Sequence, residues 1–284
     1  MAEIRAEHLT HIYSADTPFE KVAVRDVSVT IPAGQFAAII GHTGSGKSTL
    51  VQLLNGLLKP DTGTVLIDGK DIWQEPKKIR DVRFKVGLVM QYPEHQLFAD
   101  TVREDIGFGP RNMGLDKDEI KRRVEESAAF AGLEPEILDK SPFDLSGGQK
   151  RRVALSGVLA MDPEVLILDE PAAGLDPAGR RDILGGIKKF SREKGTCVII
   201  VSHSMEDMAM YCDDIIVMAN AKILMHRPCA EVFSEAELLS SVGLDVPQIT
   251  KIARLMQQNG ADIGLDVYTV DYAVDKILEL RRKQ

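Results

Sequence analysis

The chain has 284 residues, of which 44% are hydrophobic and 27% charged, and its formal net charge of -8 argues against a general nucleic-acid-binding surface. Its cysteines, Cys197, Cys212 and Cys229, are too few and too scattered for a disulfide framework or a zinc site, so we expect a reducing cytosol. We find no signal-peptide core and no run of about 20 apolar residues that would span a bilayer. Work at a membrane would therefore require docking onto another protein.

Short apolar runs recur along the chain, and each one ends in glycine or polar residues. The runs are 36–40, 86–90, 165–168 and 197–201. They are typical of strands buried on both faces, and the segments between them are long enough for crossover helices. We therefore predict an α/β fold with a mainly parallel sheet and flanking helices. An antiparallel pair of strands, over 4–13 and 23–31, is predicted beside this sheet.

Residues from about 92 to 160 depart from the strand pattern and predict a helical subdomain. Within them, the segment 118–133 carries an apolar stripe with charges on the opposite face, as in an amphipathic helix. The stripe consists of Ile120, Val124, Ala128 and Ala131. We expect this subdomain to project from the sheet.

The tail of the chain predicts further helices. One helix is expected within 245–260, with Ile249, Ile252 and Met256 on one stripe, and another over 269–282, where Thr269 can cap the start. The tail carries no residues that indicate chemistry, so we expect a role in packing or interaction. The chain thus divides into a main domain over 1–230 and a C-terminal helical extension over 231–284.

The sequence GHTGSGKST at 41–49 fits the pattern G-x-x-x-x-G-K-[ST] of a phosphate-binding loop. It follows a predicted strand and precedes a helical run, which is the context that the motif requires. Lys47 would reach the β- and γ-phosphates of a nucleotide, and the Ser48 hydroxyl would bind Mg²⁺. The residues expected to bind the nucleotide are Gly41, His42, Thr43, Gly44, Ser45, Gly46, Lys47, Ser48 and Thr49. A glycine-rich turn with an incidental lysine is the alternative.

Polar residues also end the other predicted strands. Gln91 follows 86–90, Asp169 and Glu170 follow 165–168, and His203 lies just beyond 197–201. Ligands bind beyond the carboxyl ends of parallel strands, so we expect these residues to surround the phosphates.

The residue types suggest a role for each of these groups. Asp169 suits a magnesium site, and Glu170 could orient or deprotonate an attacking water. Gln91 could bind Mg²⁺ or that water, and the His203 imidazole could contact the γ-phosphate. A structural role is the alternative for His203, because a single histidine after a strand carries little information about function.

A second glycine-containing helix start, LSGGQ at 145–149, follows the predicted helical subdomain. It offers a hydroxyl and exposed N–H groups at the positive end of a helix dipole of about half a charge. A segment far from Lys47 can hardly reach the same nucleotide within one chain, but in a head-to-tail dimer it can reach the partner's γ-phosphate. We therefore expect a separate set of residues to bind the partner's ATP: Ser146, Gly147, Gly148 and Gln149.

In kind and in order, these motifs resemble those of ATP-binding cassette (ABC) ATPases, over about residues 4–225. The matching elements are GHTGSGKST, Gln91, LSGGQ, VLILDE at 165–170, AGLD at 173–176 and His203. The resemblance implies a P-loop NTPase of the cassette type that binds ATP and Mg²⁺. It further implies that Tyr13 stacks on adenine, that Glu170 is the general base, and that Asp176 contacts the other chain of a dimer.

Longer stretches resemble the ATPases of energy-coupling factor (ECF) transporters, which drive uptake of vitamins or of cobalt and nickel ions. These stretches are 90–110, 141–161 and 170–177, and QYPEHQLF at 91–98 resembles the second of two sister ATPases. The resemblance implies a peripheral protein at the cytoplasmic face of the cell membrane, with a sister ATPase and a transmembrane T component as partners. A homodimer is the alternative to the sister pair, and a membrane subunit that captures the substrate is an indirect partner. The rival functions are the ATPase of another ABC importer class and a soluble ABC ATPase outside transport.

Overall fold

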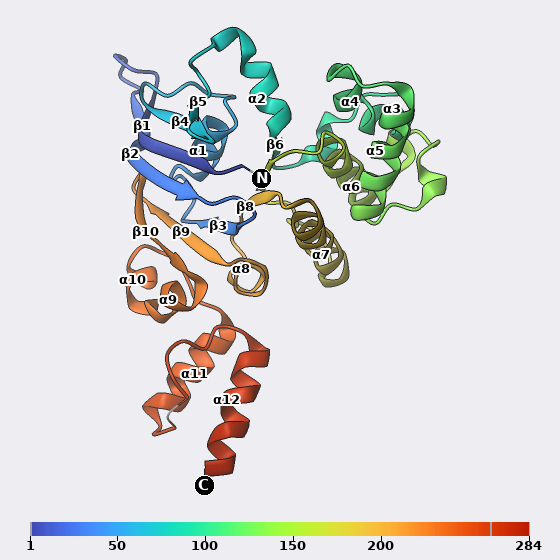
Figure 1. The fold of residues 1–284 in the computed structure, drawn as a ribbon. Helices are drawn as coiled ribbons and strands as arrows, with labels where there is room; N and C mark the ends of the chain where they lie inside the picture. The colour runs from blue at the N-terminus through green and yellow to red at the C-terminus, as the bar shows by residue number, and fades with distance from the viewer. Residues whose placement is uncertain (1, 262, 284) are drawn as a thin grey trace.

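The computed structural model describes residues 2–261 and 263–283. Residues 1, 262 and 284 belong to the predicted main domain and extension but lie outside the described residues. Two sheets and several groups of helices make up the fold (Figure 1).

The central sheet contains the predicted parallel strands. Its strand order is β10-β9-β3-β8-β7-β6, and only β10 runs antiparallel to its neighbour. The strands are β3 (Phe36–Ile40), β6 (Val86–Val89), β7 (Val165–Asp169), β8 (Cys197–Val201), β9 (Asp214–Ala219) and β10 (Lys222–Pro228). All residues of β3 and β8 are buried, because helices or the second sheet cover both faces. The prediction of a mainly parallel sheet is confirmed.

The second sheet is antiparallel, in the order β2-β1-β4-β5. It consists of β1 (Ile4–Tyr13), β2 (Lys21–Ile31), β4 (Thr62–Ile67) and β5 (Lys70–Asp71). Its inner face and α1 (Lys47–Leu54) share one hydrophobic core with the central sheet. The predicted antiparallel pair is confirmed, and α2 (Ile79–Lys85) leads from this region into β6.

A group of helices projects from the sheet, on the right of Figure 1, and has a hydrophobic core of its own. It comprises α3 (Val102–Ile106), α4 (Phe108–Asn112), α5 (Lys117–Phe130) and α6 (Gly147–Leu159), preceded by the short 3-10 turn η2 (Pro93–Gln96). Val124 and Ala128 of the predicted stripe are buried in this core, and Ile120 packs against it. Ala131 instead belongs to a larger hydrophobic core, which includes residues of the central sheet.

The remaining helices fall into two sets. One set packs on the central sheet and contributes to its core: α7 (Pro177–Lys194), α8 (Met205–Tyr211), α9 (Cys229–Ser234) and α10 (Ala236–Ser241). The other set, α11 (Gln248–Gln258) and α12 (Val270–Lys283), has a small separate core and lies at the bottom of Figure 1. In the predicted stripe of α11, Ile249 and Met256 pack against that core, whereas Ile252 is 49% exposed. The core of α11 and α12 therefore includes only part of the predicted stripe.

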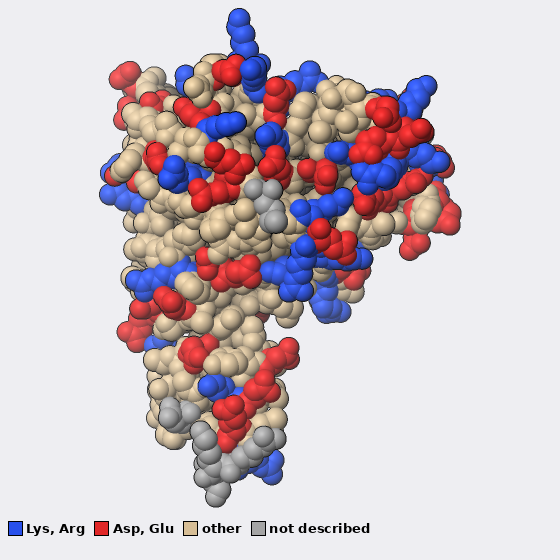
Figure 2. Space-filling model, in the orientation of Figure 1, with Lys and Arg blue, Asp and Glu red and all other residues tan. Residues whose placement is uncertain are grey.

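Among the described residues, none of the helices combines the length and the apolar character that crossing a membrane requires. On the face shown in Figure 2, acidic and basic side chains are interspersed with uncharged residues.

Candidate active site

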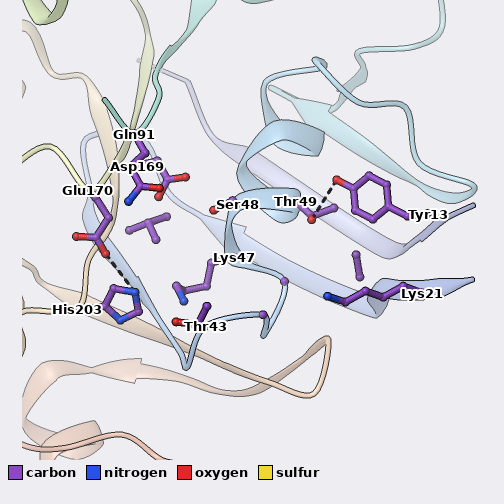
Figure 3. Close-up of a pocket in the computed structure, with 14 residues that line it drawn as sticks. Tyr13, Lys21, Thr43, Lys47, Ser48, Thr49, Gln91, Asp169, Glu170 and His203 are labelled. Carbon is purple, nitrogen blue, oxygen red and sulfur yellow. Dashed lines mark hydrogen bonds and ion pairs between the residues drawn. The ribbon is translucent and has the colours of Figure 1, made fainter. Parts of the chain in front are cut away.

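A cavity of about 280 Å³ lies at the edge of the central sheet where β3, β6, β7 and β8 end (Figure 3). These strands are parallel, so their carboxyl ends present their following residues to the same space. The lining residues are Tyr13, Lys21, Ala23, Thr43, Gly44, Gly46, Lys47, Ser48, Thr49, Gln91, Asp169, Glu170, Val201 and His203. The structure thus brings together most of the predicted residues from four separate segments.

The loop between β3 and α1 wraps one side of the cavity. Gly46 has φ 105°, and a Cβ there would lie 2.2 Å from the carbonyl oxygen of Ala23, so only glycine fits. Lys47 is buried, and its Nζ donates hydrogen bonds to the carbonyl oxygens of Gly41 at 2.7 Å and His42 at 3.1 Å. Burial lowers the pKa of Lys47, although Glu170 and Asp169 oppose this shift. The loop therefore places a single cation among backbone groups, as binding of a phosphate chain requires.

Three residues of the predicted phosphate loop do not line the cavity. Gly41 and Ser45 are buried within the loop and do not reach the cavity. The Nδ1 atom of His42 pairs with the carbonyl oxygen of Thr43 at 2.9 Å. The Ser45 N–H donates to the carbonyl oxygen of His42 at 3.1 Å, which closes the turn. These residues shape the loop from behind.

Glu170 stands at the end of β7 in a strained backbone conformation. Its φ is 54°, in the left-handed region that a non-glycine residue rarely adopts, and its N–H donates to the carbonyl oxygen of Val201 at 2.9 Å. Burial and then the neighbouring charge of Asp169 raise the pKa of Glu170 to about 7. A carboxyl group poised near neutral pH can act as a general base.

His203 approaches Glu170 from the end of β8. Its Nε2 lies 3.5 Å from Glu170 Oε1, a buried oxygen that has no hydrogen-bond partner among the described residues. Burial and then the charge of Lys47 lower the pKa of His203, so its imidazole is neutral at pH 7 and still has one N–H to donate. Figure 3 shows His203 and Glu170 on the same side of the cavity as Lys47.

The residues predicted to hold Mg²⁺ supply suitable atoms. Ser48, Gln91 and Asp169 all line the cavity, and they offer a hydroxyl, an amide carbonyl and a carboxylate. Burial raises the pKa of Asp169, although the neighbouring Ser48 hydroxyl and Lys47 oppose this shift. Hard oxygen donors of this kind, together with phosphate oxygens and water, are those that Mg²⁺ prefers. The donor set therefore fits the ion.

Tyr13, at the end of β1, forms the other end of the cavity. Its hydroxyl lies 3.3 Å from Thr49 Oγ1, at the start of α1. Lys21, Ala23 and Val201 also line the cavity, although they belong to none of the predicted motifs. All three residues lie within strands, where their residue types do not indicate a binding site. Lys21 could have been selected from its place at the start of β2, because it pairs with Tyr13 of β1.

The predicted second phosphate-binding segment lies outside the cavity. Ser146 caps α6: its Oγ accepts a hydrogen bond from the Gln149 N–H at 3.3 Å, and the Gln149 side chain accepts one from the Ser146 N–H at 3.0 Å. Ser146 and Gly147 are exposed, and Gly148 and Gln149 are partly exposed. Asp176, also exposed, caps α7 by accepting a hydrogen bond from the Gly179 N–H at 2.9 Å. Both helix starts are thus presented to the outside of this chain.

Fold and cavity together define a P-loop nucleotide-binding protein of the cassette type. The family model described as "ABC transporter" matches residues 24–173, and a model of an "AAA domain, putative AbiEii toxin, Type IV TA system" matches the shorter stretch 140–208.

Curated relatives and solved structures agree with the first of these families. The chain is 51% identical to the "Energy-coupling factor transporter ATP-binding protein EcfA2" of Clostridium perfringens, over 98% of each chain. It is 52% identical to the protein of the same name from Clostridium acetobutylicum, over 98% of this chain and 97% of the relative. The structure of cbiO1 from Clostridium perfringens, "part of the ABC transporter complex cbiONQ", superposes with a TM-score of 0.75 at 40% identity, over 89% of this chain and 98% of the other. An ATP-binding cassette, MJ0796, solved as a dimer in a post-hydrolysis state with ADP and phosphate, gives a TM-score of 0.73 at 27% identity, over 80% and 98% of the two chains.

The chain belongs to the ABC transporter family, and within it to the ATP-binding proteins of ECF transporters. The predicted family, the predicted fold class and the predicted class of enzyme, an ATPase that drives transport, are confirmed. The roles of individual residues and the domain bounds stay predictions.

Proposed function

We propose that this chain and a second cassette close head-to-tail on two ATP molecules and open again after hydrolysis. The second cassette is a sister ATPase or, alternatively, another copy of this chain. One observation carries the proposal: Lys47, Asp169 and Glu170 lie in one cavity, whereas the starts of α6 and α7 are exposed outside it. Anion-binding N–H groups at the start of α6 would complete the phosphate site of the facing chain. The dimeric cassette solved with ADP and phosphate is a precedent for such pairing.

Within the closed dimer, the chain's own residues divide the work of hydrolysis. The phosphate loop and Lys47 bind the β- and γ-phosphates, and Tyr13 stacks on the adenine ring. Glu170 takes a proton from the attacking water, which its raised pKa favours at neutral pH. The neutral His203 donates a hydrogen bond to the γ-phosphate. Mg²⁺, when held by Ser48, Asp169 and Gln91, neutralises charge on the phosphate oxygens.

Loss of the γ-phosphate would open the dimer. The segment of the facing chain that corresponds to Ser146–Gln149 contacts the γ-phosphate only in the closed dimer, and ADP lacks this phosphate, so the closed state binds ATP more tightly than ADP. A ligand shifts a two-state equilibrium by its difference in affinity for the two states. ATP therefore favours closure, and ADP favours opening.

A second hollow, beside the segment that follows Gln91, suits a membrane partner. It measures about 470 Å³ and is lined by Phe98, Ala99, Asp100, Glu104, Phe108, Arg111 and Asn112. Phe98 and Phe108 are 59% and 47% exposed, and their rings meet edge to face with centroids 4.9 Å apart. Exposed aromatic side chains rimmed by charges are typical of a protein-binding surface. We propose that coupling helices of a transmembrane T component bind here.

The complex would take up a micronutrient at the cell membrane. The names of the relatives support an ECF transporter, and this chain would be peripheral on the cytoplasmic face. The transported vitamin or metal ion would be captured by a separate membrane subunit. Co-purification of a small membrane T protein with the tagged chain would support an ECF transporter. Co-purification of the membrane subunits of an importer that uses a periplasmic binding protein would contradict it.

The catalytic part of the proposal is tested with Glu170→Gln. We expect this variant to bind ATP but to hydrolyse it at least about 100-fold more slowly, because the general base is lost. Size-exclusion chromatography with light scattering should then show a dimer that persists in ATP. Adding Lys47→Ala should abolish the dimer together with nucleotide binding. Normal turnover by Glu170→Gln, or an ATPase rate per chain that does not change on dilution of the wild type, would contradict the shared site.

A further inference from the structure

A buried ion pair joins three of the segments that the proposed closed dimer would use. Arg151 in α6 is 7% exposed, and Glu94 in η2 is 18% exposed. Arg151 Nε donates to Glu94 Oε2 at 3.2 Å, and Arg151 Nη2 donates to Glu94 Oε1 at 2.9 Å. The remaining nitrogen of the guanidinium, Nη1, donates to the carbonyl oxygen of Ala173.

The three partners come from different parts of the fold. Arg151 lies two residues beyond the Ser146–Gln149 segment, in the helical subdomain. Ala173 lies in the turn between Glu170 and Asp176, and its own N–H donates to the Glu170 carbonyl oxygen at 3.2 Å. Glu94 lies three residues after Gln91, in the segment that leads to the hollow at Phe98. One side chain therefore connects the start of α6, the turn after the catalytic base, and η2.

The chemistry of this contact requires arginine. Burial alone would raise the pKa of Glu94, but the hydrogen bond and charge of Arg151, together with a backbone hydrogen bond and the neighbouring His95, lower the pKa overall, so the carboxylate stays ionised at neutral pH. A guanidinium can engage both carboxylate oxygens and still donate to a carbonyl in the same plane. A lysine has one nitrogen on a flexible stem and cannot make all three contacts in this geometry.

We infer that Arg151 is a positioning residue for the shared ATP site. It holds the start of α6 and the Ala173 turn at one spacing, so that the Ser146–Gln149 segment meets the facing nucleotide while Asp176 meets the facing chain. Through Glu94, the same unit extends to η2, so a displacement of η2 by a membrane partner also displaces the partner-binding segment. The inference rests on the proposed function. It adds that the Arg151 side chain links the start of α6, which would bind the facing nucleotide, to η2, which leads to the hollow at Phe98.

The test uses the full-length chain carrying Glu170→Gln, whose ATP-bound dimer the proposed function predicts. Arg151→Lys in this background should leave the affinity of the single chain for a fluorescent ATP analogue (mant-ATP) within about twofold, because Lys47 and the phosphate loop are untouched. The ATP-dependent dimer should weaken about tenfold or more, since charge-assisted hydrogen bonds that set the interface are lost. This split between nucleotide binding and dimer formation would not arise from general destabilisation.

A double variant guards against failure to fold. Glu94→Gln with Arg151→Met removes both charges, and therefore leaves no unpaired charge buried. We expect it to melt close to the parent and to show the same dimer defect as Arg151→Met alone, because the two residues act as one unit. Arg122→Met is the matched control: this exposed arginine pairs with Glu119 and Glu126 within α5, and its loss should leave the dimer unchanged.

The outcomes separate the two proposals. Absence of a dimer in the Glu170→Gln parent would overturn the proposed function and this inference with it. A parent that dimerises, combined with Arg151→Lys and double variants that dimerise at the same ATP and protein concentrations, would overturn only the role of Arg151. Equal loss of mant-ATP binding and dimer formation would also overturn it, because the ion pair would then serve the fold alone.

Discussion

At the scale of single residues, Glu170 carries several unfavourable features at once. Its backbone is left-handed, the next residue is Pro171, and its carboxyl group is buried beside Asp169. Each feature costs free energy of folding, and such costs concentrate where function sets the geometry. Replacing the carboxyl group removes only the last of these costs, which should make the chain more stable, and under the proposed function it also removes catalysis.

We expect Glu170→Gln to raise the free energy of unfolding at pH 8 by on the order of 2 kcal/mol in buffer with a metal chelator. The pKa of Glu170 is about 7 in the folded chain against a usual value of 4.5, so protonation favours the folded state. The wild type should lose stability as pH rises from about 4.5 to about 7, and the variant should not lose this contribution. Denaturant titrations at pH 5 and pH 8 measure the difference. The same stability gap at both pH values would contradict the assigned cause.

The residues of the site differ in how far the sequence predicts them. Gln91, Asp169, Glu170 and His203 were predictable because they follow continuous apolar runs, and parallel strands place their carboxyl ends at one edge. Tyr13 needed the resemblance to a family, since no pattern distinguishes it from a core or surface tyrosine. Lining residues inside strands, such as Ala23, were not predictable, because their role follows from how the loop packs on β2 and not from their residue type.

At the scale of elements, strand prediction succeeded for the partly buried pair β1 and β2 and for the strands of the central sheet whose burial is almost complete. The strands β3, β7 and β8 are buried almost throughout, so their sequences consist almost entirely of apolar residues and are easy to recognise. By contrast, β4 is only half buried and β5 has two residues, so both depend on pairing with β1 and with each other. The strand β9 was not predicted, although it contains an apolar run like those of the predicted strands. No motif residue follows it.

The start of α6 allows a direct test of the exposed phosphate-binding segment. Ser146→Arg loses a helix cap, at a cost of about 1 kcal/mol, and places a bulky side chain where the facing nucleotide would bind. We expect unchanged mant-ATP affinity in the single chain and no ATP-dependent dimer of two altered copies. In a pair with a sister ATPase, only one of the two sites should be blocked.

A matched control is available in the same subdomain. Asp116 caps α5 by accepting a hydrogen bond from the Glu119 N–H at 2.9 Å, and it is exposed. Asp116→Arg should cost similar stability but leave the dimer intact. Equal effects of both variants on dimer formation would argue that capping alone, and not contact with a nucleotide, explains the Ser146 result.

At the scale of the whole molecule, the predicted domain boundary after residue 230 falls inside α9. The packing of the C-terminal helices suggests a different division. Val232, Phe233 and Leu239 are almost fully buried in the same core as the central sheet. The separate core of α11 and α12 begins beyond Pro247. We infer that α9 and α10 are required for the cassette to fold, whereas α11 and α12 are not.

Two truncations test this division. A variant that ends at residue 247 should fold and bind mant-ATP within about twofold of the full chain, because the cavity and the main core are retained. A variant that ends at residue 230 should not fold stably, since each large core side chain that is lost costs about 2 to 5 kcal/mol. Circular dichroism on heating gives the readout, and a residue-230 variant that melts like the full chain would contradict the assignment.

The close approach of Gly46 to Ala23 bears on which part of the molecule can move. Together with the contact between Tyr13 and Thr49, it packs the antiparallel sheet directly against the phosphate loop. With Tyr13 stacked on the purine ring as proposed, this packing would set the distance between that ring and the triphosphate, and an analogue with a longer linker between base and phosphates would reach only one end. We therefore expect the loss of one phosphate to move the neighbouring helices relative to this packed unit, and not to change the distance within it.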